Sequence, residues 1–179
     1  LLDHANDLVE WQEWGEAALE VARSANKPIL LTIGYRGCRG CEAMARESFC
    51  NPSVAAVMNE HFINIKVDRD ERPDLDKVYQ SALQLIVPKS GGWPLTVFLE
   101  PDSQLPFFGG SYFPQQAQQQ MPGFQDLLLR IIDSFDNKRE GLDEQSQKLS
   151  QALDQLTPPV LDPGVEDFAL LEHGRGQLL

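Results

Sequence analysis

Two cysteines three residues apart, Cys38 and Cys41, are the residues of this sequence best suited to chemistry. A CxxC pair can exchange with a disulfide, and it can also form half of a zinc site. A zinc site needs two more ligands, usually as a second close pair, and the other soft ligands are scattered at His4, Cys50, His61 and His173. We therefore expect redox chemistry without metal or cofactor, with a zinc site and an inert binding site as the alternatives.

The residues around the pair predict different roles for the two sulfurs. Ile29–Ile33 is a buried strand, a glycine-containing turn follows it, and Cys38 stands where a helix begins. Unpaired N–H groups at a helix start favour a thiolate, and Arg36 and Arg39 add positive charge. Cys41 follows one turn later. We expect Cys38 to be an exposed nucleophile and Cys41 a more buried resolving thiol.

The third cysteine, Cys50, is predicted to be separate from this site. It follows Cys41 by nine residues on the same expected helix, which corresponds to about 13 Å of rise and half a turn of rotation. That separation exceeds the reach of a disulfide. We expect Cys50 to be a small apolar residue at the helix end.

A second motif, Gly91–Pro94, precedes the apolar strand Leu95–Leu99. Proline at the start of an internal strand, after two glycines and an aromatic residue, favours a cis X–Pro bond, although an ordinary turn is the alternative. A cis bond would present the backbone edge of Trp93 beside the cysteines for pairing with an extended substrate. The substrate-binding residues predicted on this basis are Arg39, Gly40, Trp93 and Pro94.

The pattern of apolar residues predicts how the chain positions these motifs. Helices are expected at 11–26, 38–50, 51–61 and 73–86, strands at 29–33, 63–67, 95–99 and 105–108, and helical sequence from 121 to about 156. Alternating strands and helices followed by a hairpin indicate an α/β fold, a mixed central sheet with helices on both faces.

The C-terminal part has a different character and is expected to extend from the domain. Apolar residues recur every seven positions at Leu128, Phe135, Leu142, Leu149 and Leu156. This narrow stripe favours docking on another domain or subunit through 121–156. The alternatives are a coiled coil, or a first half, Phe124–Phe135, that closes the domain and is followed by an exposed arm. We divide the chain into a domain at 1–136 and a helical arm with a linker-like tail at 137–179.

Composition excludes several classes of function. Fifteen Lys and Arg residues against 27 Asp and Glu give a net charge of −12, which disfavours a nucleic-acid partner. The longest apolar runs are too short to cross a bilayer. No charged and then apolar leader begins at Leu1, which favours a cytoplasmic location; because the first residue is not Met, earlier removal of a leader stays open.

Together these residues resemble the thioredoxin superfamily, and more specifically the thioredoxin-like N-terminal domain of the spermatogenesis-associated protein 20 family. The matching segments run in order from Leu1 to Pro114: Leu1–Ala5, Val9–Trp11, Trp14–Ala18, Lys27–Tyr35, Met44, Arg46–Phe49, Lys66–Arg69, Glu71–Asp74, Gly91–Pro94 and Phe107–Pro114. The resemblance implies a three-layer thioredoxin-like fold, redox-active Cys38 and Cys41, and a cis Pro94. It also implies a partner, because family members usually continue into a large α-helical toroid.

Four positions depart from that resemblance. Gly40 and Glu42 stand where the family usually has Trp and His, and Leu8 replaces a proline. Thr32 occupies the position at which thioredoxin keeps a buried acid that accepts the proton of the second thiol. We therefore expect that proton to pass to Glu42 or to water. These departures concern the substrate and the rate more than the fold.

Overall fold

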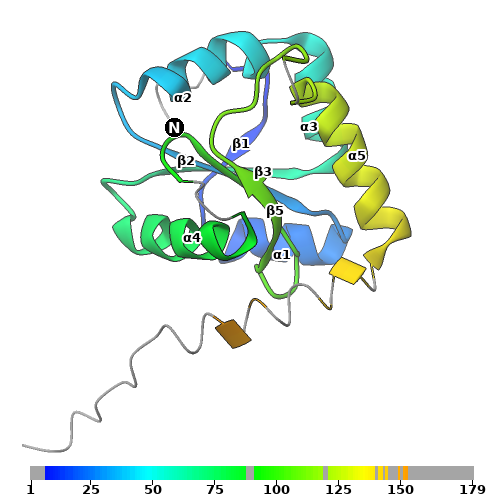
Figure 1. Cartoon of the computed structure of the whole chain (residues 1–179). Coiled ribbons are helices and arrows are strands. Elements are labelled where there is room, and N and C mark those ends of the chain that lie inside the picture. Colours follow the sequence, from blue (N-terminus) through cyan, green and yellow to red (C-terminus); the bar gives the residue numbers. More distant parts are fainter. Residues whose placement is uncertain are drawn as a thin grey trace, which may run out of the picture.

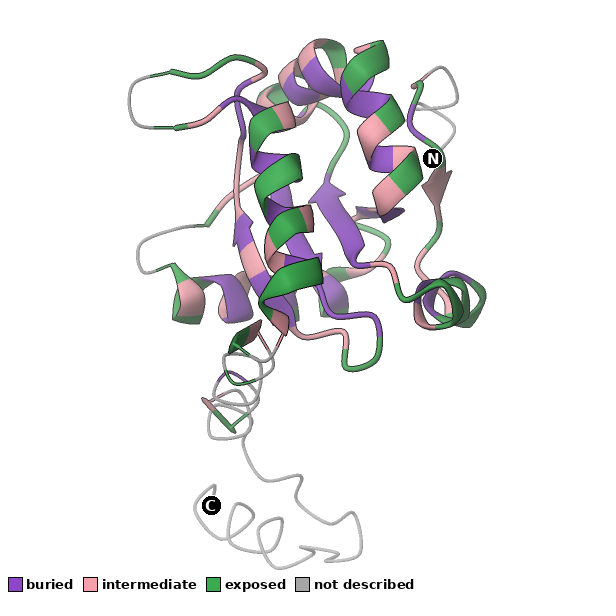
Figure 2. Cartoon of the chain, turned by 90° about the vertical axis from the view of Figure 1, so that its right-hand side faces the viewer, coloured by how far each residue is buried: buried purple, intermediate pink, exposed green. Residues whose placement is uncertain are grey.

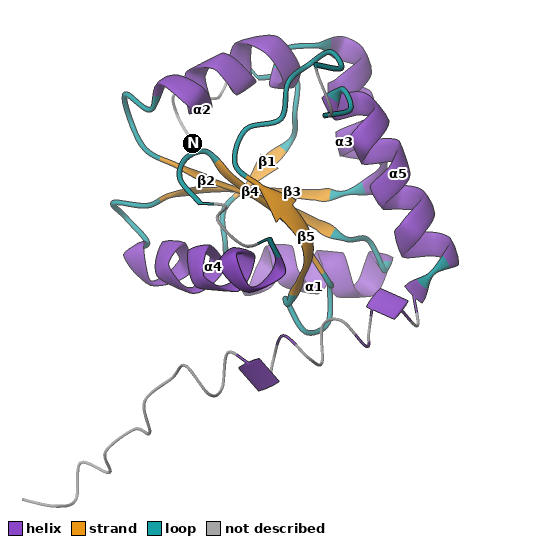
Figure 3. Cartoon of the chain, in the orientation of Figure 1, coloured by secondary structure: helices purple, strands orange, loops and turns teal. Residues whose placement is uncertain are grey.

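The computed structural model describes residues 7–87, 91–118, 121–139, 141–142, 144, 149 and 151–152, and within them five strands form one mixed sheet (Figure 1, Figure 3). The strands are β1 (Trp11–Gln12), β2 (Ile29–Gly34), β3 (Ile63–Asp68), β4 (Leu95–Leu99) and β5 (Pro106–Gly110). Their order across the sheet is β1-β3-β2-β4-β5. The first three strands are parallel, whereas β4 is antiparallel to β2 and β5 is antiparallel to β4. The mixed sheet predicted from the sequence is confirmed.

Helices cover both faces of this sheet and make three layers (Figure 1). One face carries α1 (Glu16–Ala25) and α4 (Pro73–Ile86); the other carries α2 (Arg39–Met44), η2 (Ala45–Phe49), α3 (Pro52–His61) and α5 (Phe124–Asn137). Each layer boundary has its own apolar cluster, and every residue of β2 and β4 is buried (Figure 2). The three-layer α/β arrangement expected from the sequence is confirmed.

Local signals set several of these boundaries. The side chain of Asn51 accepts hydrogen bonds from the backbone N–H groups of Ser53 and Val54, at 3.0 and 3.3 Å, and therefore caps α3. Pro52 and Pro73 lie in the first turns of α3 and α4, where a missing N–H costs nothing. Asn26 ends α1 in the left-handed conformation, with φ of 48°.

Two predicted helices differ from the structure. The helix expected from Trp11 begins only at Glu16, because Trp11 and Gln12 form a strand that pairs with β3. This pairing satisfies backbone groups across the chain, which local periodicity cannot report. The helix expected at Cys38 begins at Arg39 with Cys38 as its cap, and its second half is the π-helix η2.

The helix expected through Leu156 is interrupted. Helix α5 ends at Asn137, Lys138 is not helical, and helical residues resume at Arg139. Arg139 donates hydrogen bonds to Asn26 Oδ1 at 2.7 Å and to Glu100 Oε2 at 3.3 Å.

The apolar stripe that led to the docking prediction packs on this domain where it is described. Leu128 and Phe135 belong to the core, Leu142 packs against that core, and Leu149 is buried. Leu156 and the tail predicted after it lie outside the described residues. Within the described part, no helix combines the length and apolar character needed to cross a membrane.

Candidate active site

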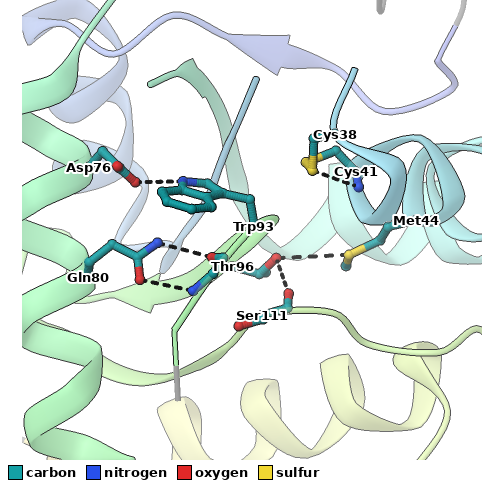
Figure 4. The surroundings of a disulfide bond; sticks show 9 residues. Cys38, Cys41, Met44, Asp76, Gln80, Trp93, Thr96 and Ser111 are labelled. Carbon is teal, nitrogen blue, oxygen red and sulfur yellow. Dashed lines mark hydrogen bonds between the residues drawn. A yellow bond between two sulfur atoms is a disulfide. The ribbon is translucent and has the colours of Figure 1, made fainter. Parts of the chain in front are cut away.

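Strand β2 delivers the two cysteines to one end of the sheet. The strand ends at Gly34, a turn follows in which the N–H of Cys38 donates to the carbonyl of Tyr35 at 3.2 Å, and α2 begins at Arg39. Cys38 and Cys41 form a disulfide with their Cα atoms 5.2 Å apart. The N–H of Cys41 donates to Cys38 Sγ at 3.2 Å, as Figure 4 shows. The structure therefore brings the predicted pair together at a helix start, with a donor directed at the first sulfur.

The exposures of the two cysteines are the reverse of those predicted. The side chain of Cys38 is only 3% exposed, whereas Cys41 is half-buried. The physical reason is the capping bond, because the side chain of Cys38 turns over the helix start to accept the N–H of Cys41. Cys41 instead lies against Gly34, where a Cβ would be 2.8 Å from Cys41 Sγ. The expectation of an exposed Cys38 and a buried Cys41 is wrong for the oxidised pair.

The predicted cis peptide bond is present between Trp93 and Pro94. This loop lies against the residue between the cysteines: a Cβ built on Gly40 would be 3.1 Å from the carbonyl oxygen of Trp93 and 3.0 Å from Pro94 Cδ. Gly40, Trp93 and Pro94 therefore meet, as the substrate-groove prediction requires, whereas the side chain of Arg39 is exposed to solvent.

Helix α4 holds this loop through two polar side chains that sequence reasoning missed (Figure 4). Asp76 accepts a hydrogen bond from Trp93 Nε1 at 2.9 Å. The side-chain amide of Gln80 donates to the carbonyl of Gly92 at 3.0 Å and accepts its N–H at 3.3 Å. The available signal was their spacing, since residues four apart on a helix lie on one face. These bonds fix the orientation of the loop beside the disulfide.

Arg69 completes the rim of the site. Its guanidinium lies 4.1 Å from the ring centroid of Trp93 and 5.3 Å from that of Tyr35, and these two rings contact edge to face at 5.8 Å. Arg69 sits in the charged run from 68 to 74, which the sequence predicts to be a structural ion-pair network, and its contact with Trp93 was not predicted. The structure shows a cation–aromatic cluster directly beside the cis peptide bond.

Another pair in the same charged run has a local structural role. Arg72 makes two hydrogen bonds to Asp74, at 2.9 and 2.7 Å. This pairing lowers the pKa of Asp74 from its ordinary value to about 2. The pair lies at the start of α4, where a carboxylate is favourable.

A lysine whose side chain is only 12% exposed lies on the same side of the sheet as α2. Lys66 Nζ lies 4.8 Å from the ring centroid of Trp11, 5.2 Å from that of Phe49, and 3.9 Å from Asp7 Oδ2. Burial lowers the pKa of Lys66 to about 8, and the neighbouring Asp7 and Cys50 oppose this shift. Lys66 therefore releases its proton more readily than a solvated lysine does.

Cys50 is separate from the pair and stands at a helix end, as predicted, but it is not packed as an apolar residue. Its side chain is exposed, and its sulfur lies 4.0 Å from Asp7 Oδ1. The expectation of apolar packing is wrong because Cys50 caps the end of the π-helix and faces solvent rather than the core.

Thr32 stands in the sheet register between Lys66 on β3 and Thr96 on β4. Its side chain is 2% exposed, and its hydroxyl has no hydrogen-bond partner among the described residues. Thr96, in contrast, donates to the carbonyl of Ser111 at 3.4 Å (Figure 4). The position of the buried acid in thioredoxin is thus filled by an uncharged hydroxyl that has no partner within the described part of the chain.

The described residues contain no cluster of three or more His, Cys, Asp or Glu side chains that could hold a metal ion. Of the scattered ligands considered above, His61 lies 3.8 Å from Glu60, and His4 and His173 fall outside the described part of the chain.

Comparisons with known proteins agree with this geometry. The family model described as "Thioredox_DsbH: Protein of unknown function, DUF255" matches residues 1–154. Spermatogenesis-associated protein 20 of Homo sapiens is 44% identical over 153 residues, which cover 86% of this chain and 19% of the human protein. The protein of the same name from Rattus norvegicus is 43% identical over the same coverage. The chain thus spans about a fifth of the length of these relatives.

The structure is also similar to a solved structure called DsbH Oxidoreductase. The TM-score is 0.50 with 18% sequence identity, and the match covers 70% of this chain and 83% of the other. An identity at this level establishes the fold. The thioredoxin-like fold and the family resemblance expected from the sequence are both confirmed.

Proposed function

The chain belongs to the Thioredox_DsbH family, and from that premise we propose that it is a thiol–disulfide oxidoreductase that uses Cys38 and Cys41 as its dithiol. The observation that carries this proposal is the disulfide itself, placed at a helix start beside a cis-proline loop, with the N–H of Cys41 donating to Cys38 Sγ. A donor at 3.2 Å stabilises negative charge on that sulfur once the pair is reduced.

The proposed reduction of a substrate has two steps. The Cys38 thiolate attacks one sulfur of the substrate disulfide, so a Cys38–substrate mixed disulfide forms and the other substrate sulfur leaves as a thiolate. Cys41 then loses its proton and attacks Cys38 Sγ, which re-forms the Cys38–Cys41 disulfide and releases the second substrate thiolate. Thr32 cannot accept the Cys41 proton as a carboxylate would. That proton therefore passes to Glu42 or to water.

Protein disulfides are the substrates that we propose for Cys38. The backbone of Trp93 lies beside the residue between the cysteines, and its indole is held by Asp76 and Arg69. A fixed backbone edge next to the reactive sulfur can pair with an extended polypeptide. Arg39 and Gly40, which stand between the cysteines, would contact such a substrate first.

The decisive experiment measures reduction of insulin disulfides in the presence of dithiothreitol. The wild-type protein should accelerate the reaction, and Cys38→Ser and Cys41→Ser should each abolish the acceleration. In cell extract, Cys41→Ser should retain substrates covalently on Cys38, whereas Cys38→Ser should not. Because Cys38 is nearly buried in the oxidised pair, trapping on Cys41 alone would reverse the assigned roles. Equal insulin reduction with and without the protein would exclude the activity.

A second candidate function is a non-catalytic interaction module that docks on a larger helical domain. The observation that favours it is length, since the relatives are about five times longer than the segment they share with this chain. Binding of a partner through 121–156 that persists in Cys38→Ser, together with no insulin reduction by the wild type, would support this candidate over the oxidoreductase.

A further inference from the structure

The two sulfurs of the oxidised pair differ in their access from one particular cleft. A cleft of about 720 Å³ lies beside the ends of β2 and β3, and Cys41 and Gly34 line it. Cys38 does not contribute to this lining and is 3% exposed. The absent side chain of Gly34 leaves the space that Cys41 Sγ occupies at the cleft wall. An attacking group in this cleft therefore meets Cys41 first.

The size and charge of the cleft indicate a small polar ligand. Its volume falls in the range of small-molecule sites. Its charged lining consists of three cations and three carboxylates: Arg36, Lys66, Arg72, Glu13, Asp68 and Glu71. Charges of both signs suit a ligand that carries both an ammonium and carboxylate groups.

One residue that lines the same cleft carries a buried hydroxyl for which the described residues offer no partner. Thr32 lines it, is 2% exposed, and has no hydrogen-bond partner for its oxygen among the described residues. A buried polar group of this kind costs free energy unless something satisfies it. Because this oxygen is closed to solvent in the oxidised protein, a polar ligand or a water in the cleft would reach it only with a shift of the cleft wall.

We propose that a low-molecular-weight thiol with both ammonium and carboxylate groups enters this cleft and reduces the oxidised protein by attacking Cys41. This inference rests on the proposed function. The thiolate bonds to Cys41 Sγ while the Cys38–Cys41 bond breaks and Cys38 leaves as a thiolate. A second thiolate of the same kind then attacks the ligand sulfur of the mixed disulfide. It releases the small-molecule disulfide and leaves Cys41 reduced, so two thiols are oxidised and one protein disulfide is reduced.

The hydrogen bonding at the pair favours this direction of attack. The N–H of Cys41 already points at Cys38 Sγ, so negative charge that develops on Cys38 meets a donor at 3.2 Å. A sulfur with a stabilised thiolate is the better leaving group in thiol–disulfide exchange. Accessibility of Cys41 and stabilisation of Cys38 thus act together. The protein would use Cys38 for polypeptide substrates and Cys41 for its small-molecule reductant, and Pro94 of the cis-proline loop lines the same cleft as Cys41.

Peptide mapping can test this directly, because Arg39 separates the two cysteines for trypsin. Oxidised wild-type protein is mixed with reduced glutathione, and free thiols are blocked rapidly with N-ethylmaleimide. Digestion then yields Cys38 in the peptide Gly37–Arg39 and Cys41 in the peptide Gly40–Arg46. We expect glutathione on the Cys41 peptide in about fivefold or greater excess over the Cys38 peptide. Equal labelling, or labelling mainly on Cys38, would overturn the inference.

A variant at the cleft rim gives an independent test. Glu71→Trp fills space at an exposed lining position, and we expect the rate of reduction by glutathione to fall about threefold or more. Asp126→Trp is the matched control, because it removes the same charge at an exposed position on α5 away from the cleft. Equal rates for the two variants would count against the cleft as the entry site.

Insulin reduction by the wild type with dithiothreitol distinguishes failure of the oxidoreductase function from failure of the Cys41 entry route. If that activity is present and glutathione labels Cys38, the oxidoreductase function stands and the Cys41 entry route fails. If the pair exchanges with neither insulin nor glutathione, the function itself fails.

Discussion

The carbonyl oxygen of Trp93 lies 3.1 Å from the point where a Cβ on Gly40 would be built. The same Cβ would lie 3.0 Å from Pro94 Cδ, so the helix start and the cis-proline loop approach as closely as a glycine allows. The neighbouring atoms belong to backbone and to a proline ring, and they cannot rotate away. The residue between the two cysteines therefore sets the distance between the disulfide and the loop that would bind substrate.

Gly40→Ala should destabilise the protein despite the better helix propensity of alanine. The propensity gain is about 0.5–1 kcal/mol, and the overpacking cost is about 1–3 kcal/mol. We expect a net loss of about 1 kcal/mol in the free energy of unfolding, measured with urea. Gly141→Ala is the control, because Gly141 is helical and has open space around its Cβ position. A gain in Gly40→Ala as large as that in the control would contradict the close approach.

Thr32→Val should stabilise the protein. The hydroxyl of Thr32 is buried without a partner among the described residues, so its removal relieves a desolvation cost of about 1 kcal/mol. Thr96→Val, at the paired position on β4, should destabilise because Thr96 donates to the carbonyl of Ser111. Thermal unfolding of the two variants in the absence of small thiols compares them. Losses of thermal stability of similar size in both variants would show that the hydroxyl of Thr32 has a hydrogen-bond partner.

Lys66 should make stability rise with pH above neutrality. Its pKa is about 8 in the folded protein against 10.5 for a solvated lysine, so between these values the unfolded chain binds more protons. The free energy of unfolding should therefore increase from pH 7 to 9.5, by at most about 2 kcal/mol from this residue.

Urea titrations of Cys50→Ser and of Cys50→Ser with Lys66→Met measure this contribution. The serine removes the free thiol, which lies near Asp7, and the methionine removes the lysine. The free energy of unfolding of Cys50→Ser, which retains Lys66, should rise with pH relative to that of the double variant. Parallel pH profiles would mean that Lys66 keeps the pKa of a solvated lysine.

The reduction potential should be less negative than the roughly −270 mV of thioredoxin. The N–H of Cys41 and the charge of Arg39 both favour the reduced, ionised form of Cys38. Because Arg39 is exposed, Arg39→Gln should shift the potential by only about 10 mV towards more negative values. Equilibration with glutathione buffers measures it, with the exposed Arg130→Gln on α5 as control. A wild-type potential well below that of thioredoxin would refute the expectation.

The sequence by itself determined the parts of this protein that depend on local chemistry. The cap at Asn51, the prolines that open α3 and α4, the apolar runs of β2 and β4, and the spacing of Cys38 and Cys41 act within a few residues. Even the cis bond before Pro94 could be predicted, because the glycines and the strand that surround it are adjacent in the chain.

Tertiary structure decided what depends on residues far apart in the chain. Pairing with β3 made a strand of Trp11 and Gln12, and the capping bond together with Gly34 decided which cysteine faces the cleft. Asp76, Gln80 and Arg69 reach Trp93 only because α4 and the end of β3 lie beside the cis-proline loop. Periodicity reports which face of an element is apolar, whereas access, pairing and the pKa of Lys66 are set by whatever the fold packs against that face.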